Sequence, residues 1–509
     1  MRAASGVRRW RRGVLAVAAG ALPAPAFPEP SLWWWAYAAL VPWLLLLRTA
    51  DSGRRAAVEG WLGGTGFLLA THHWLAPSLH VFLLVVAALL GLLWAPWGWL
   101  ARRLLGGTPG PGRALAAVVL LPSAWLVIEL VRSWEYLGGP WALLGASQWQ
   151  VPPALRLASL GGVWLVTVWL VAVNTVLVVL AALPRARTAA VAAAVVCALV
   201  PAAVWAWGPL PRPSGTVRVA VVQPGVVEGP EVRFEAGARL TRELAGRDAD
   251  LVVWGESSVG YDLGDRPGLR DRLAGLSARV GAPLLVNVDA RRSDRPGIFK
   301  SSVLVGPGGP TGRYDKMRLV PFGEYIPARS LLGWATAVGR AAEEDRRRGK
   351  NPVVADADGT AAGLLVCFES AFPDMSRALA RDGAELLVAQ SATSTFQESW
   401  APEQHASLAA LRAAETWRPM VHATLTGVSA VHGPRGGPVG GRLGTGHRGA
   451  AVYEVPLASG TSPYVRLGDW VPAAALGALS AAGAVAAAGR VRGRRAGRAS
   501  VSGTAPVRR

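Results

Sequence analysis

The stretches VVWGESS (residues 252–258) and GLLVCFES (residues 363–370) indicate the fold class of the C-terminal half of this chain. Each begins as a short apolar run and then reaches a single reactive side chain, the carboxylate of Glu256 in the first and the thiol of Cys367 in the second. Apolar runs of this length suit strands that are buried on both faces of a sheet. The two stretches therefore predict strand ends that project a carboxylate and a thiol into one cleft.

Four further runs of the same kind surround these two stretches. They are RVAVVQP (218–224), APLLVNVDA (282–290), SSVLVGP (301–307) and AELLVAQSAT (384–393). Amphipathic stretches over 231–247 and 266–280 lie between some of the runs and have the apolar spacing of helices. Strands that alternate with helices predict a layered α/β domain in which helices sandwich the sheet.

A third stretch, RYDKMRLVPFGEYIP (residues 313–327), adds an amine to this site. Lys316 is one of three lysines among 53 basic residues, and it follows the predicted strand at 302–306 by a short turn that contains GPGGPTG. Taken singly, a glutamate at a strand end is usually a cap or an ion-pair partner, and a lysine is usually solvated. Together, however, a lysine stabilises the reactive thiolate form of a cysteine and a carboxylate takes the thiol proton. Glu256, Lys316 and Cys367 therefore predict an acyl-transfer site with a cysteine nucleophile.

Long apolar runs fill the first 208 residues and recur near the C-terminus. The mean hydropathy of +0.30, the 51% share of hydrophobic residues and the 23 tryptophans exceed what the core of an ordinary soluble domain requires. Most of the runs are long enough for a hydrocarbon core, which takes about 20 helical residues to cross. The runs cover residues 13–28, 32–47, 57–76, 79–100, 114–131, 160–183, 188–208 and 469–489. The sequence thus predicts a polytopic α-helical membrane domain with about eight transmembrane helices.

The distribution of the net charge of +20 indicates how the chain crosses the membrane. Arginines gather in the two terminal tails and in alternate gaps between the apolar runs, whereas the intervening gaps supply only Arg132 and Arg156. By the positive-inside rule, both termini are expected in the cytoplasm. A signal peptide over residues 1–27 is the alternative interpretation of the first run, and its removal would leave the orientation of the later spans unchanged.

This topology divides the chain into four segments. They are a membrane domain with seven helices over 1–208, an extracytoplasmic catalytic domain over 209–468, an eighth transmembrane helix over 469–489 and a basic cytoplasmic tail, expected to be disordered, over 490–509. No nucleic-acid motif accompanies the arginines, so a nucleic-acid partner is not expected. The two cysteines imply no disulfide, because Cys197 lies inside an apolar run as a small filler and Cys367 is the candidate nucleophile.

The chain resembles the apolipoprotein N-acyltransferases in Glu256, Lys316 and Cys367 and in the motifs RLVPFGEYIP and VCFES. The outer domain of that family belongs to the nitrilase, or carbon–nitrogen hydrolase, superfamily, and the resemblance spans nearly the whole chain. It implies an αββα sandwich on the extracytoplasmic side of a bacterial cell membrane. It also implies that these three residues are catalytic, that Glu324 and Glu369 support the site, and that no metal or diffusible cofactor is needed.

The reaction that the resemblance implies is a two-step transfer through a thioester on Cys367. A membrane phospholipid would donate the acyl group, and the N-terminal S-diacylglyceryl-cysteine of an apolipoprotein would accept it on its α-amine. Two alternatives remain. One is a membrane-anchored amidase or nitrilase-type hydrolase that uses the same three residues with water as the acceptor, and the other is a catalytically degenerate membrane scaffold.

Three segments bear on substrate contacts. Phe368 stands where relatives often carry tyrosine, and residues 391–396 read SATSTF where relatives often show an Asn-Asp-x-Trp-Phe run. The stretch 328–350 is expected to be a lid that reaches the membrane interface, with Arg346 to Arg348 near lipid headgroups, or else a surface helix that packs on its own domain.

Overall fold

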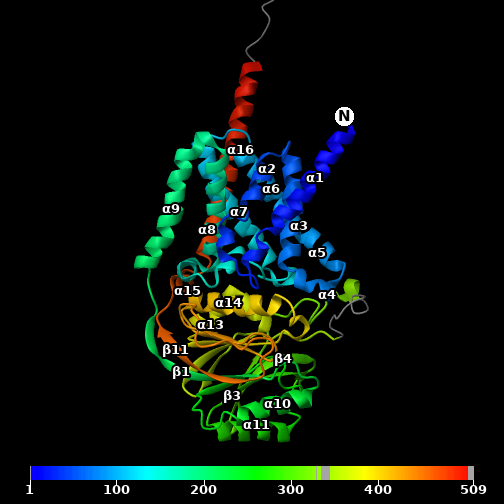
Figure 1. Cartoon of the computed structure of the whole chain (residues 1–509), viewed down its shortest axis with the longest axis vertical. Helices are drawn as coiled ribbons and strands as arrows, with labels where there is room; N and C mark the ends of the chain where they lie inside the picture. Colours follow the sequence, from blue (N-terminus) through cyan, green and yellow to red (C-terminus); the bar gives the residue numbers. More distant parts are fainter. Residues whose placement is uncertain (1, 328, 334–343, 502–509) are drawn as a thin grey trace, which may run out of the picture.

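The computed structural model of the chain describes residues 2–327, 329–333 and 344–501. A layer of helices stands on a two-sheet α/β domain, and shorter helices lie between the two (Figure 1). The helical layer consists of α1 (Arg2–Ala21), α2 (Val41–Arg48), α3 (Gly53–Thr71), α4 (Ala76–Leu79), α5 (Phe82–Gly91), α6 (Ala95–Leu105), α7 (Pro111–Arg132), α8 (Pro152–Ala182), α9 (Arg187–Trp207) and α16 (Trp470–Val501).

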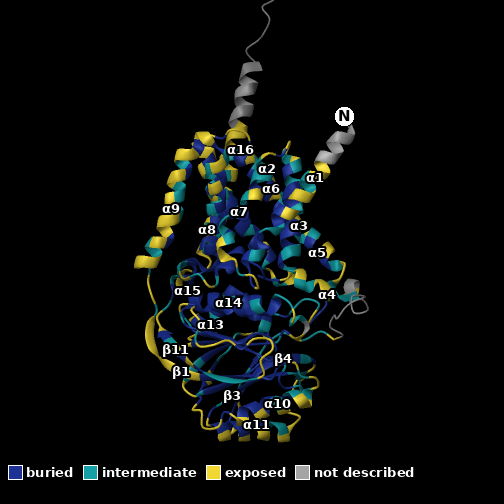
Figure 2. Ribbon diagram, viewed as in Figure 1, coloured by how far each residue is buried: buried dark blue, intermediate teal, exposed yellow. Residues whose placement is uncertain are grey.

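Five helical segments of the described chain are long and apolar enough to cross a membrane. They are Phe82–Leu105, Pro111–Arg132, Pro152–Ala182, Pro184–Trp207 and Trp470–Val491. Helix α9 exposes apolar side chains such as Val195 and Leu199 along its outer face (Figure 2). Exposed apolar surface of this extent on a long helix is typical of contact with lipid. The prediction of a membrane protein is thus supported, whereas the number of eight spans stays a prediction.

The predicted span over residues 32–47 is wrong as a single helix. The chain there forms a 3₁₀ turn (Trp33–Tyr37) and then the eight-residue helix α2, after a stretch rich in proline, a residue that cannot continue a helix hydrogen-bond ladder. Asn174 of α8 satisfies the open backbone, because its Oδ1 accepts from the Leu40 N–H at 2.9 Å and its Nδ2 donates to the Ala36 carbonyl at 2.8 Å. Irregular backbone at this depth is tolerated where other protein groups complete its hydrogen bonds.

Buried tryptophans form the centre of the helical layer. The Trp125 ring lies 5.2 Å from Trp97, 5.5 Å from Trp94 and 6.0 Å from Trp43, measured between ring centroids. Such edge-on aromatic pairs add to the dispersion energy of the packing. Part of the tryptophan content therefore belongs to the core of the helical layer.

Eleven strands of the described chain form the α/β domain. They are β1 (Arg212–Gln223), β2 (Leu251–Trp254), β3 (Leu284–Arg291), β4 (Ile298–Gly306), β5 (Gly309–Asp315), β6 (Val354–Ala357), β7 (Thr360–Val366), β8 (Leu386–Ser391), β9 (Met420–Thr424), β10 (Ala430–His432) and β11 (Gly449–Ser459). All six runs predicted as strands are strands, namely β1, β2, β3, β4, β7 and β8. The predicted α/β class of this domain is confirmed.

Two sheets pack face to face between layers of helices. One sheet has the order β11-β1-β2-β3-β4-β5 and the other β10-β9-β8-β7-β6, and each has three parallel strands at its centre. Side chains such as Val221 and Val388 fill the space between the sheets. Helices α10 (Pro230–Arg242) and α11 (Pro267–Val280) cover the outer face of the first sheet, and α13 (Pro373–Arg381) and α14 (Ala401–Thr416) cover that of the second. The arrangement is an αββα sandwich.

Helix α14 joins the α/β domain to the helical layer, and it is buried along its whole length. Helix α8 breaks where it meets α14, because Gly161 and Gly162 have non-helical backbone angles and Gly162 has a φ of +70°. The freed Val163 N–H donates to Glu415 Oε1 of α14 at 2.7 Å. Arg412 of the same helix donates to Glu415 at 2.8 Å and to the Ala371 carbonyl at 2.9 Å. The buried ion pair of Arg412 and Glu415 thus connects the break in α8 to the turn that contains Cys367.

Two predicted segments need correction or lie outside the description. Helix α16 continues to Val501, so the part of the tail up to that residue is helical rather than disordered, and residues 502–509 lie outside the described chain. Most of the predicted lid, residues 328 and 334–343, also lies outside it. In the described remainder, Arg346 pairs with Asp289 at 3.5 Å and Arg348 pairs with Glu135 at 2.5 Å, so these two arginines bind carboxylates of the protein.

Removal of either partner of the junction ion pair should destabilise the protein strongly. Arg412→Met and Glu415→Gln each leave a buried, uncompensated group, so each should lower the free energy of unfolding by about 3–5 kcal/mol. The double variant should lose less than the sum of the two, because no charge is then left unpaired. Unfolding titrations in detergent micelles measure these values, and additive losses would show that the two side chains do not depend on each other.

Candidate active site

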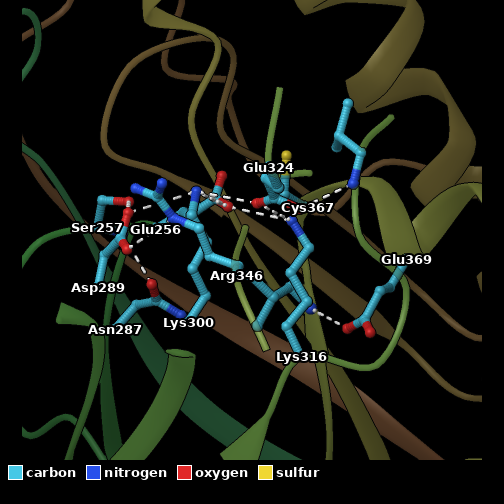
Figure 3. Close-up of polar contacts among 12 residues, drawn as sticks. Glu256, Ser257, Asn287, Asp289, Lys300, Lys316, Glu324, Arg346, Cys367 and Glu369 are labelled. Carbon is cyan, nitrogen blue, oxygen red and sulfur yellow. Dashed lines mark hydrogen bonds and ion pairs between the residues drawn. The ribbon is translucent and has the colours of Figure 1, made fainter. Parts of the chain in front are cut away.

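The three predicted residues meet where strand ends of both sheets come together. Glu256 follows β2 after a single glycine, Lys316 directly follows β5, and Cys367 directly follows β7 (Figure 3). A β-carbon on Gly255 would lie 1.8 Å from the Leu425 nitrogen, so only glycine fits where the end of β2 crosses the opposite sheet. The prediction that strand ends bring these three side chains together agrees with the geometry.

The route to Lys316 differs from the prediction. The sequence predicts that GPGGPTG is a short turn between the strand at 302–306 and the lysine. Most of it instead belongs to β5, which forms a hairpin with β4. Pro307 and Gly308 make the tight turn, and Gly309 has a φ of +110°. Lys316 therefore lies one strand further along the sheet than predicted.

Cys367 sits on a sharp turn. It leaves β7 with a φ of +52°, in the left-handed region that residues with a side chain adopt rarely, and begins a 3₁₀ turn (Cys367–Ala371). Its carbonyl accepts a hydrogen bond from Ser370 Oγ at 3.0 Å and lies 3.0 Å from His405 Nε2. Contacts on the carbonyl hold the backbone of the turn, which leaves the thiol free to face the charged side chains.

Four side chains form a closed ring of alternating charge, which we call the charge ring: Glu256, Lys316, Glu324 and Lys300. Lys316 Nζ lies 3.3 Å from Glu256 Oε1 and 2.8 Å from Glu324 Oε1. Lys300 Nζ lies 2.8 Å and 3.1 Å from the same two oxygens. All four side chains are largely or fully buried, so their charges interact more strongly than they would in water.

The charge ring decides the protonation of the reactive groups. Burial opposes the charge of Glu256, but Lys300 and Lys316 outweigh it and hold the pKa of that carboxyl at about 2. Burial likewise opposes the charge of Lys316, but Glu324 and Glu256 raise the pKa of its amine above the ordinary value. Burial and the charge of Glu256 raise the pKa of the Cys367 thiol to about 12, although both lysines act to lower it. The resting site thus holds an ionised carboxylate, a charged amine and a protonated thiol.

Glu369 and Glu324, the two predicted supporting residues, act at different places. Glu324 faces Lys316 in the charge ring. Glu369 binds backbone instead: its Oε1 accepts from the Met317 N–H at 2.7 Å and its Oε2 from the Val366 N–H at 2.8 Å. Tyr314 also donates to Oε1, at 2.7 Å. Glu369 therefore ties the segment after Lys316 to the end of the strand that carries the thiol.

Lys300 is the residue that the sequence prediction missed. The scarcity of lysine, which singled out Lys316, applies equally to Lys300, but no motif marks its place near the start of β4. His405 of α14 was also not predicted as part of the site, although it contacts the Cys367 backbone. Among the described residues, no cluster of His, Cys, Asp or Glu side chains could hold a metal ion.

The segments that depart from the family pattern face the helical layer. The Phe368 ring packs edge-on against Phe372, with centroids 5.0 Å apart, and both rings lie against Gly139 of the connection between α7 and α8. Phe396 packs against Trp74, with ring centroids 4.9 Å apart. These positions therefore contribute apolar contact between the site and the helical layer.

Comparisons with known proteins relate both halves of the chain to named families. The apolipoprotein N-acyltransferase N-terminal domain matches residues 19–176, and the carbon-nitrogen hydrolase domain matches residues 218–462. A protein of Azotobacter vinelandii named apolipoprotein N-acyltransferase is 33% identical over 92% of this chain and 94% of its own length. A protein of Geobacter metallireducens with the same name is 29% identical over 90% of this chain and 91% of its own length. Among solved structures, a mutant of the Nesterenkonia AN1 amidase from the nitrilase superfamily matches 51% of this chain and 96% of its own, with 19% identity and a TM-score of 0.36.

An αββα sandwich with a Glu, Lys and Cys cluster, joined to apolar helices, defines a membrane-associated member of the carbon–nitrogen hydrolase class. Within that class, the full-length similarity is more specific. The chain belongs to the apolipoprotein N-acyltransferase family.

The raised thiol pKa predicts how Cys367 reacts with a neutral alkylating agent. In a Cys197→Ala background, the rate constant for iodoacetamide should rise about tenfold per pH unit from pH 7 to 10 without a plateau, because the thiolate fraction grows in that way below a pKa of about 12. Lys316→Met should slow the reaction at every pH, since Lys316 favours the thiolate. The exposed Lys350→Met is the matched control and should react like the parent. A plateau near neutral pH would contradict the prediction.

Proposed function

We propose that this chain transfers an acyl group from a membrane phospholipid to the α-amine of the N-terminal S-diacylglyceryl-cysteine of an apolipoprotein, through a thioester on Cys367. The observation that carries the proposal is the contact between the nucleophile turn and the helical layer, at Phe368 and Gly139. Gly139 also lines an apolar cavity of about 110 Å³ whose other walls include Leu68 and Leu83. Apolar surface of this kind, packed against the turn that carries Cys367, suits contact with the apolar part of a lipid.

In the first step, Glu256 takes the thiol proton and the Cys367 sulfur attacks the ester carbonyl of the phospholipid. This proton transfer moves charge from Glu256 to the sulfur without changing the net charge of the buried site. Lys316 has three N–H donors, of which Glu256 and Glu324 accept two, so one remains for the oxyanion of the tetrahedral intermediate. The intermediate collapses to the thioester, and the leaving lysophospholipid alkoxide takes the proton from Glu256.

In the second step, the neutral α-amine of the lipoprotein attacks the thioester carbonyl. Glu256 takes a proton from the attacking nitrogen, the amide forms, and the thiolate leaves and recovers that proton. The products are the N-acylated lipoprotein and the enzyme with its free thiol. The residues of this chain supply nucleophile, base and oxyanion donor, so the mechanism uses no cofactor.

The hydrolase with water as acceptor is the second candidate, because the same three residues serve both reactions. The extent of the helical layer favours the lipid reaction. A soluble substrate would need no membrane contact, whereas Trp74, Phe396 and Phe368 bring apolar surface of both parts to the edge of the site. A degenerate scaffold is disfavoured, because Glu256, Lys316 and Cys367 keep the geometry that acyl transfer needs.

We also propose a topology of eight spans in a bacterial cell membrane, with both termini in the cytoplasm and the α/β domain on the extracytoplasmic side. The alternation of arginine-rich gaps supports this orientation. Residues 1–208, 209–468, 469–489 and 490–509 are the corresponding segments. Lipoprotein acceptors anchored in the outer leaflet would reach a catalytic domain on that side.

Intact mass spectrometry after incubation with phospholipid tests the chemistry. The parent protein should gain the mass of one acyl group, hydroxylamine should remove it, and a diacylglyceryl-cysteine peptide should accept it as an amide. Cys367→Ser should gain no hydroxylamine-sensitive mass, and Cys197→Ala is the matched control that should behave like the parent. Discharge of the acyl group to water alone would support the hydrolase, and the absence of any adduct would support the scaffold.

Labelling with a membrane-impermeant maleimide tests the topology. In a background without Cys197 and Cys367, Arg239→Cys on α10 should react in intact spheroplasts. Arg54→Cys, at the start of α3, should react only after the membrane is permeabilised, because the proposal places it in the cytoplasm. Both positions are exposed in the folded protein, so folding does not hide them. The reverse labelling pattern would overturn the proposed orientation.

A further inference from the structure

Lys300 occupies an unusual position for a lysine. It is the third residue of β4, its side chain is 13% exposed, and its Nζ contacts both carboxylates of the charge ring, Glu256 at 2.8 Å and Glu324 at 3.1 Å. The distance to Glu256 is shorter than that from Lys316, which is 3.3 Å. The predicted base is therefore bound more closely by Lys300 than by the lysine that the motif revealed.

Charges around Lys300 are balanced. Figure 3 places Lys300 on the side of Glu256 that faces Asp289 and Arg346, away from Lys316 and Glu369. Asp289 lies 3.7 Å from Lys300 Nζ and pairs with Arg346 at 3.5 Å. The whole group contains three cations and three carboxylates: Lys300, Lys316, Arg346, Glu256, Glu324 and Asp289. Two further titratable groups, Cys367 and His405, also interact electrostatically with Glu256.

We propose that Lys300 is a positioning residue whose positive charge acts on both half-reactions. In the first, it holds Glu256 as an anion next to the thiol. In the second, it restricts the reaction to acceptors whose amine is neutral. The part that concerns the acceptor rests on the proposed function. The part that concerns Glu256 and the thiol does not depend on the substrate.

The first effect follows from where the ammonium lies. Lys300 and Lys316 both donate to the same Glu256 oxygen, which restrains the carboxylate where it also hydrogen-bonds with Cys367. Both cations also favour the thiolate that forms when the proton moves, although Lys316 has the larger influence. Loss of Lys300 should therefore weaken thiolate formation while the fold, the nucleophile turn and Lys316 remain in place.

The second effect follows from repulsion. An acceptor α-amine must approach Glu256 to lose its proton, and an α-ammonium group would meet the positive charge of Lys300 beside that carboxylate. Like charges a few ångströms apart in a buried site repel strongly. The α-amino group has an ordinary pKa of about 8, so the neutral form is scarce below that pH. Lys300 should thus lower the pKa of the α-amine once it is bound, so the bound acceptor becomes neutral at a lower pH in the parent protein than without Lys300.

The first experiment measures alkylation of Cys367 by iodoacetamide between pH 7 and 10, in the Cys197→Ala background. Lys300→Gln should lower the rate constant at each pH by about three- to tenfold, since one nearby buried cation alters a pKa by up to about one unit. Lys300→Arg keeps the charge and should restore most of the rate. Lys350→Gln, at the exposed third lysine of the chain, should match the parent. An unchanged rate in a folded Lys300→Gln protein would overturn the first effect.

The second experiment isolates aminolysis. The acyl-enzyme is formed with phospholipid, separated from it, and mixed with a diacylglyceryl-cysteine peptide between pH 6 and 9. At saturating peptide, the pH of half-maximal rate should rise by about half a unit or more in Lys300→Gln relative to the parent and to Lys350→Gln, because the bound ammonium is then less repelled. A purely structural lysine would change the rate without moving this midpoint, and an unmoved midpoint would overturn the second effect. If the parent forms no acyl-enzyme, the proposed function fails, and alkylation alone decides the role of Lys300.

Discussion

The charged state of one fully buried lysine, Lys316, governs the organisation of this site. Taking an ammonium group out of water is costly unless carboxylates surround it in good geometry. Glu256 and Glu324 provide that geometry, and Lys300 completes the ring by binding both of them. Burial and the charge of Glu256 keep the thiol of Cys367 protonated at rest, whereas both lysines favour the thiolate.

The contact between the α/β domain and the helical layer extends this organisation into the membrane region. Arg412 of α14 holds the carbonyl of Ala371 in the nucleophile turn, and its partner Glu415 completes the hydrogen bonding of α8 where that helix breaks. Gln404 adds a second link, since it binds the Trp141 indole at 2.7 Å and the Pro28 carbonyl at 2.9 Å. The packing of the helical layer and the position of the Cys367 turn therefore depend on the same buried helix.

Much of the site was predictable because strands buried on both faces leave a clear apolar signal. That signal located the ends of β2 and β7, and with them Glu256 and Cys367. It failed for β5, whose sequence GPTGRYD is polar and glycine-rich because the strand lies at a sheet edge. The apolar run over 32–47 caused the opposite error, because it predicts a continuous helix that the structure does not have. Asn174, far along the chain, completes the hydrogen bonds of the interrupted backbone there, and composition alone does not reveal this.

Local sequence was enough to predict a membrane protein with an α/β domain, and to predict that a carboxylate, an amine and a thiol lie at strand ends. Those features depend on hydropathy, periodicity and residue type, which are properties of short stretches. The protonation of the thiol, the role of Glu369 as a backbone tie and the presence of Lys300 beside Glu256 depend on distances between residues from different strands and turns. Such distances, and the burial that gives them their electrostatic strength, exist only after both sheets and the helical layer have packed together.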